Sequence, residues 1–410
     1  MQDQALRPSV SLLLNVAHTL DHLFLLIFAT AVAAIARDFG LARWEDLMPY
    51  GAGAFLMFGL GSLPAGRLGD HWGRRQMMLV FFFGIGASAL LVATTRGPWT
   101  LAAALALLGC FSSIYHPVGI PMLVQRTRRP GAAIGFNGFA GNLGIAAAAI
   151  STGMLVEAAG WRAAFVVPGL ACIALGLLFW RLAPRESEPP AERTHKADVQ
   201  LSRGELARVM AVLTVASASS GLVFNLTTNG NGQMLGERLA AQVSDPSTLG
   251  WLLGAVYAVA SLAQIVVGRL IDRYALKPLW LAMVGAQVPM LAAAAVAPGW
   301  WAWLALLGSM IVVFGAIPFT DATIVRFVDD RMRSRVAGLR LAIALGISSA
   351  AVWALGPAVK AAGFGTLFAV MALVALFSAG VLLLLPHEGA RSERAGATGA
   401  GAPLPQSPLR

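Results

Sequence analysis

The chain has 410 residues, of which 57% are hydrophobic and only 12% are charged, and its mean hydropathy is +0.71. Soluble proteins carry about a quarter of their residues as charges, so this composition excludes a soluble globular protein and indicates an integral membrane protein. The formal net charge is +10, and the apolar runs are long and continuous rather than alternating, which excludes an outer-membrane barrel.

Twelve membrane-spanning helices are predicted, six in each half, because each apolar run reaches the roughly 20 residues that cross the hydrocarbon core. Their approximate ranges are 9–36, 46–66, 76–95, 98–124, 131–158, 162–182, 206–230, 249–268, 278–298, 300–325, 336–359 and 363–385. The predicted fold is an all-α membrane protein of two pseudo-symmetric six-helix bundles, residues 1–182 and 206–386. Polar, proline-bearing residues 183–205 are interpreted as a cytoplasmic linker, and residues 387–410 as a disordered cytoplasmic tail.

The basic residues predict the orientation, because Lys and Arg gather in loops that stay in the cytoplasm. With both termini inside, 24 of the 30 Lys and Arg residues face the cytoplasm. The outer side then holds Arg37, Arg43, Arg96, Arg162, Arg238 and Lys360. Topology and anionic membrane lipid therefore explain the net charge without nucleic acid as a partner. We expect a multi-pass protein of the bacterial inner membrane.

The first span carries a polar stripe. Asn15, His18, Asp21 and His22 are spaced by three, three and one residues, so an α-helix places them on one face. A charge at the bilayer centre costs at least about 2.5–3.5 kcal/mol on insertion scales. This face must therefore meet a partner helix or a water-filled cavity, and we expect it to handle protons or substrate.

A charged island between the second and third spans reads Gly-Arg-Leu-Gly-Asp-His-Trp-Gly-Arg-Arg, from Gly66 to Arg75. A worn copy, Gly-Arg-Leu-Ile-Asp-Arg-Tyr, begins 202 residues later at Gly268. Because the two islands lie half a chain apart in an apolar sequence, they indicate a duplicated membrane bundle.

The fourth span holds a second histidine site, in which Tyr115 and His116 follow Ser112 and precede a proline. His116 lies ten residues from the basic residue at 126, and His18 lies eleven residues from Arg7, so the two imidazoles are expected at similar depth. We expect them to share a cavity. In the fifth span glycines recur every three residues, which lets another helix approach closely.

Three interpretations of the histidines and Asp21 remain open. A buried carboxylate beside imidazoles suits proton coupling. Alternatively, Asp21 merely hydrogen-bonds His18 or a helix end and holds the bundle together. Histidines at i and i+4, with His116 or Asp21 as a third ligand, also have metal-site spacing.

The seventh span carries neutral polar residues where the first carries titratable ones. Asn225, Thr228 and Asn229 share a face by their spacing and are candidates for substrate contact. Hydrogen bonds between packed helices explain the same residues equally well.

The spans, the linker and the island together resemble the major facilitator superfamily. The resemblance implies that the island glycines let helix ends approach, and that Asp70 caps a neighbouring helix or pairs with Arg74 to lock one conformation. The lock residues implied in this way are Gly66, Asp70, Gly73, Arg74, Arg75, Asp272 and Arg273. The second copy ends in Ala-Leu-Lys, so its lock is expected to be weaker.

The segment from Ser112 to Pro117, followed by a glycine-rich helix, also resembles the fosmidomycin-resistance type of facilitator, a group of drug exporters. The chain lacks the Gly-Pro signature that many antiporters of the superfamily carry in the fifth helix. Apart from this missing signature, the resemblance implies export of a small molecule.

The sequence therefore predicts a secondary active transporter that moves a small organic solute by alternating access, as proton-coupled efflux. The alternative is uptake of a metal ion or metal complex through a cavity lined by His and Asp. We predict no enzyme, because no nucleophile–base constellation is present. No phosphate loop is present either, so ATP-driven pumping is not expected. The expected partners are a small-molecule substrate, protons and membrane lipid, with no cofactor, and the chain is expected to be a monomer.

Overall fold

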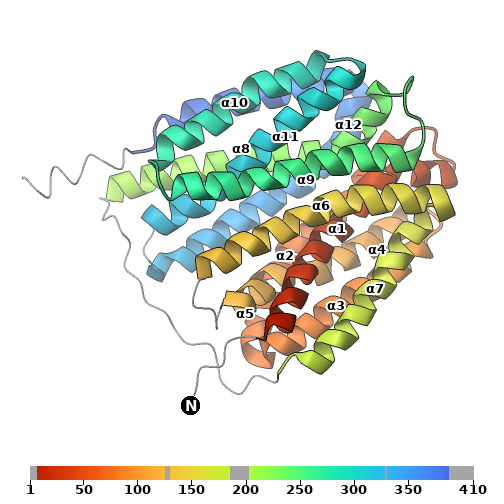
Figure 1. Ribbon diagram of the computed structural model, residues 1–410, viewed down its shortest axis with the longest axis horizontal. Helices are drawn as coiled ribbons and strands as arrows, with labels where there is room; N and C mark the ends of the chain where they lie inside the picture. The colour runs from red at the N-terminus through yellow and green to blue at the C-terminus, as the bar shows by residue number, and fades with distance from the viewer. Residues whose placement is uncertain (1–6, 125–129, 185–202, 328–329, 387–410) are drawn as a thin grey trace, which may run out of the picture.

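The computed structural model describes residues 7–124, 130–184, 203–327 and 330–386, and within these residues all regular structure is helical (Figure 1). The first half contains α1 (Pro8–Asp38), η1 (Trp44–Asp46), η2 (Met48–Gly51), α2 (Ala52–Trp72), α3 (Arg74–Ala93), α4 (Pro98–Ser112), η3 (Tyr115–Gly119), α5 (Ile120–Val124), α6 (Pro130–Ala159) and α7 (Trp161–Leu182). The second half contains α8 (Arg203–Arg238), α9 (Pro246–Ile271), α10 (Leu276–Val296), α11 (Gly299–Phe327) and α12 (Asp330–Leu382).

Ten of these helical segments are long and apolar enough to cross a membrane. The charged α2 is not among the ten, and α12 consists of two helices joined at a kink at Gly363, where φ is 74° and ψ is 168°. This bend falls where the sequence separates its last two spans. A multi-pass membrane protein is confirmed, whereas the count of twelve spans stays a prediction. The central part of the expected linker and the expected tail lie outside the described residues.

The predicted fourth span is not one continuous α-helix. It is divided into α4, the π-helical turn η3 and α5. Pro117 lies inside η3, and a proline has no backbone N–H and collides with the carbonyl one turn earlier. A wider turn accommodates this collision, and single π turns of this kind are common at functional sites. The turn presents Tyr115 and His116.

Helices from the two halves pack directly against each other, with α6 beside α9 and α2 beside α12 (Figure 1). Glycines make the contact between α6 and α9 possible. A Cβ atom at Gly250 would lie 2.5 Å from the carbonyl oxygen of Ala149, and one at Gly153 would contact the Pro246 carbonyl. The two helix backbones therefore cross at a distance that tolerates no side chain at these positions.

The internal repeat is visible in two buried cations. Arg75 donates to the carbonyl oxygens of Ala183 and Trp180, at 2.8 and 2.6 Å, and so caps the C-terminal end of α7. Lys277, 202 residues later, donates to the carbonyls of Leu383 and Leu385 at 2.7 Å beyond the end of α12. The second island thus retains a cation that bonds to carbonyls at a helix end, as Arg75 does. The comparison of the two island sequences did not predict this role.

Candidate functional site

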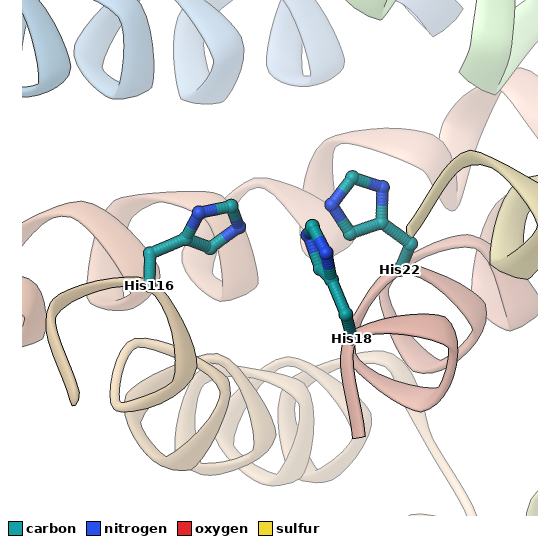
Figure 2. A group of neighbouring side chains, drawn as sticks. All are labelled: His18, His22 and His116. Carbon is teal, nitrogen blue, oxygen red and sulfur yellow. The ribbon is translucent and has the colours of Figure 1, made fainter. Parts of the chain in front are cut away.

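Three imidazoles converge between α1 and η3 (Figure 2). His18 and His22 are one turn apart on α1, and His116 reaches them from η3. The ring centre of His18 lies 4.8 Å from that of His22 and 5.0 Å from that of His116, while the His22 and His116 centres are 5.9 Å apart. The sequence predicted that His18 and His116 would lie together, and the geometry confirms their proximity.

Asp21, on the same helix as His18 and His22, contacts this cluster with its side chain fully buried. Its Oδ2 is 3.6 Å from Nε2 of His116, which is an ion pair only when the imidazole is protonated. The nearby Ser112 hydroxyl is likewise buried without a hydrogen-bond partner among the described residues. In the described structure, therefore, both Asp21 oxygens are buried without a hydrogen-bond partner, an arrangement that is costly for an isolated carboxylate anion.

His18 is the most constrained of the three histidines. Its Nδ1 lies 2.8 Å from the backbone carbonyl oxygen of Asn137, and because a carbonyl only accepts, Nδ1 carries the hydrogen. Nε2 is then the nitrogen with a free lone pair, and it is buried with no hydrogen-bond partner among the described residues. The ring stacks on Tyr115 at 4.7 Å, and Gly141 leaves room for it, since a Cβ there would lie 2.6 Å from the ring.

Asn137 of α6 joins these groups and was not among the residues predicted from the sequence. Its Nδ2 donates to Oδ1 of Asn15 at 3.0 Å and to the Tyr115 hydroxyl at 2.7 Å. The hydroxyl in turn donates to the Leu14 carbonyl at 2.8 Å. The available signal was an asparagine within the glycine-rich fifth span, where an amide inside a membrane needs partners.

The histidine cluster is partly exposed to solvent. The His116 side chain is 28% exposed and His22 is half-buried, whereas His18 and Asp21 are buried. One nitrogen of each imidazole lies within 4.8 Å of one nitrogen of the other two. The three histidines can therefore hold a cation that reaches them past His116 and His22, and Asp21 can exchange a proton with His116.

The neutral residues of α8 form a separate polar group in the second half. Asn225 donates to the Ser348 hydroxyl of α12 at 2.7 Å, and Thr228 donates to the Phe224 carbonyl on its own helix. Asn229 donates to the Asn225 carbonyl, while its Oδ1 is buried without a partner in the described part of the chain. Asn225 therefore serves packing between helices, and substrate contact by this group stays a prediction.

The residues of the implied conformational lock take different positions. Gly73 ends α2 with φ at 96°, a backbone conformation that favours glycine, and a Cβ at Gly66 would only touch Pro117 at 3.4 Å. Asp70 is 67% exposed, and its Oδ1 lies 4.0 Å from Nη2 of Arg74 in the same island. Asp272 and Arg273 are exposed at the end of α9. Arg75 makes its hydrogen bonds within its own half, so its described bonds are structural caps, and the lock itself stays a prediction.

Comparison with known proteins identifies a protein family that this chain matches. A family model described as Major Facilitator Superfamily matches residues 14–231 and again residues 210–409. The probable actinorhodin transporter of Streptomyces coelicolor is 30% identical over 161 residues, which cover 37% of this chain and 27% of that protein. The puromycin resistance protein pur8 of Streptomyces alboniger is 31% identical over 195 residues, which cover 47% of this chain and 38% of that protein. The matched regions thus span less than half of each relative.

A solved structure shows the same fold. It is the crystal structure of a bacterial homolog of the human lysosomal transporter Spinster in an inward-facing and occupied conformation. The superposition has a TM-score of 0.73 and covers 92% of this chain and 96% of that chain, at 15% sequence identity.

Proposed function

Because the chain belongs to the major facilitator superfamily, we propose that it is a secondary active transporter of the bacterial inner membrane that exports a small organic solute in exchange for protons. The similarity to the puromycin resistance protein supports export. The proposed orientation places both termini in the cytoplasm, as the distribution of Lys and Arg predicts. The fosmidomycin-type match of the fourth span is consistent with the same direction.

One observation carries the coupling proposal: a buried carboxylate with no hydrogen-bond partner faces a partly exposed imidazole. Asp21 cannot remain ionised at low cost unless His116, 3.6 Å away, is protonated. A proton that enters at His116 can therefore be passed to Asp21 or shared with it. Intramembrane carboxylates and histidines commonly form such relays in transporters.

Alternating access is proposed from the contacts between the halves. At the predicted outer end, Lys360 of α12 pairs with Asp46 of η1 at 2.5 Å, and Ser349 donates to the Ala52 carbonyl at 3.0 Å. Gly356 packs on the backbone of Glu45. We infer that these contacts close the outer side in the state described, and that they break when the halves rock to release the solute.

The test is transport by the purified chain in liposomes under an imposed pH gradient, with puromycin as the probe because one relative is a puromycin resistance protein. The native chain should move puromycin with the gradient and move protons when puromycin is added. Asp21→Asn and His116→Ala should lose gradient-driven flux while retaining puromycin binding. Asp38→Asn, a matched change at the exposed end of the same helix, should behave as the native chain. Equal flux in Asp21→Asn and native protein would reject the coupling site.

The ion pair between Lys360 and Asp46 at the predicted outer end gives a second expected result. Lys360→Ala should increase the population open at the predicted outer end by up to about fivefold, because exposed ion pairs contribute at most about 1 kcal/mol. Spin labels at the exposed positions Arg96 and Ala361, in a Cys110→Ser background, would report this as a larger fraction of long distances. Asp38→Asn breaks an ion pair with Arg162 that lies wholly within the first half, so it should leave the distances unchanged. A similar change in both variants would contradict the assignment.

A further inference from the structure

The cluster of His18, His22 and His116 has features that proton transfer does not require. A relay needs a chain of neighbouring groups, whereas here each of three neighbouring rings (Figure 2) has a nitrogen within 4.8 Å of a nitrogen of both others. Two rings come from successive turns of α1 and the third from a different element, so the arrangement depends on the tertiary fold. We propose that these three imidazoles form a binding site for a divalent transition-metal ion.

The distances between the nitrogens fit this proposal. The three candidate ligand atoms lie within 4.8 Å of one another. Nitrogens bound to one tetrahedral ion at about 2.0–2.1 Å are about 3.3 Å apart, so His22 and His116 need to approach His18 by at most about 1.5 Å. His22 and His116 are only partly buried and can make that movement by side-chain rotation. His18 cannot move as freely, because Tyr115 and Gly141 confine its ring.

The Asn137 carbonyl and Asp21 lie where other proteins place the groups that orient metal-binding histidines. Such histidines almost always donate their second ring N–H to a carbonyl or carboxylate, which fixes the tautomer. His18 does so through Nδ1 to the Asn137 carbonyl, and its unpartnered Nε2 is the nitrogen left for coordination. Asp21 lies 3.6 Å from one nitrogen of His116 and supplies a negative charge beside the proposed cation.

The ligand chemistry indicates which ions would bind. Imidazole suits Zn²⁺, Cu²⁺ and Ni²⁺, whereas Mg²⁺ and Ca²⁺ require oxygen ligands. Three protein ligands leave a fourth tetrahedral position for water or for an oxygen donor of a solute. The site is therefore expected to bind Zn²⁺ and not Mg²⁺. This inference does not depend on proton-coupled export, and its test involves no transport.

The experiment uses the full-length chain, purified with a tag that contains no histidine, and measures Zn²⁺ binding by isothermal titration calorimetry. One Zn²⁺ per chain is expected, with no binding of Mg²⁺. His18→Ala, His22→Ala and His116→Ala should each weaken Zn²⁺ binding by more than 10–100-fold, the usual loss for removing a group that merely orients a ligand. His71→Ala, an exposed histidine at the end of α2, is the matched control and should bind like the native chain. Native-like Zn²⁺ affinity in the three cluster variants would overturn the proposal.

A second measurement needs no variant and so remains decisive if His18→Ala does not fold. X-ray absorption spectra of the Zn²⁺-loaded native chain should show scattering from three imidazole rings at Zn–N distances of about 2.0–2.1 Å. Co²⁺ in place of Zn²⁺ should give the visible absorption of a tetrahedral nitrogen site. A Zn²⁺ environment of oxygen atoms alone, or failure of the native chain to bind Zn²⁺, would also overturn the proposal.

Discussion

Replacing Gly144 with alanine is expected to destabilise the protein by about 1–3 kcal/mol or more, the usual cost of overpacking a close contact. A Cβ at this position of α6 would contact the carbonyl oxygen of Thr19 on α1 and come within 3.0 Å of its Cα atom. These are backbone atoms, so the clash is relieved only when α1 and α6 separate. Separation would also stretch the hydrogen bond from the Thr19 hydroxyl to the Ala140 carbonyl, now 2.9 Å.

The matched control for this change is Gly135→Ala, nine residues earlier on α6. Gly135 is exposed, and a Cβ there would meet nothing within 4 Å. Alanine is the better helix former by about 1 kcal/mol, so Gly135→Ala should be neutral or stabilising. The two variants are thus expected to move the apparent melting temperature of the detergent-purified chain in opposite directions. A loss of stability of the same size in both would show that helix propensity, and not the contact with Thr19, decides the outcome.

The polar stripe of the first helix could be predicted because helical periodicity alone brings together residues three and four apart. The proximity of His18 and His116 could be predicted from their similar distances to basic residues at the membrane surface. Local rules could not predict the π turn that redirects His116, because a proline in a long apolar run is compatible with several kinks.

The hydrogen-bond partners of the buried cations could not be predicted from the sequence either, for a different physical reason. Arg75 and Lys277 bond to backbone carbonyls more than 100 residues away, and carbonyls look the same in every residue. The islands differ in their side chains, so the sequence alone did not show that Lys277 bonds to helix-end carbonyls as Arg75 does. Asn137 was missed on similar grounds, because its backbone carbonyl and its side-chain amide each hold a different residue of the site.

The side chain of Asn137 gives the second large expected effect. Asn137→Ala removes the amide that donates to Asn15 and to the Tyr115 hydroxyl, but it keeps the backbone carbonyl that accepts from His18. Two acceptors in a buried region then lose a donor, and each unsatisfied polar group costs about 1–3 kcal/mol. We therefore expect a loss of about 2–4 kcal/mol in unfolding free energy, by the same principle.

Asn142→Ala is the matched control for this prediction, because Asn142 is also a buried asparagine of α6. Its Nδ2 has no hydrogen-bond partner among the described residues, so its removal should cost little. A double-mutant cycle with Tyr115→Phe separates the hydrogen bond from the volume of the side chain. Because the Asn137 side chain is hydrogen-bonded to the Tyr115 hydroxyl at 2.7 Å, the losses in unfolding free energy of the two single variants should be non-additive by about 0.5–3 kcal/mol. Additive losses would show that the two side chains stabilise α1 and α6 independently, and that Asn137 is not the residue that joins them.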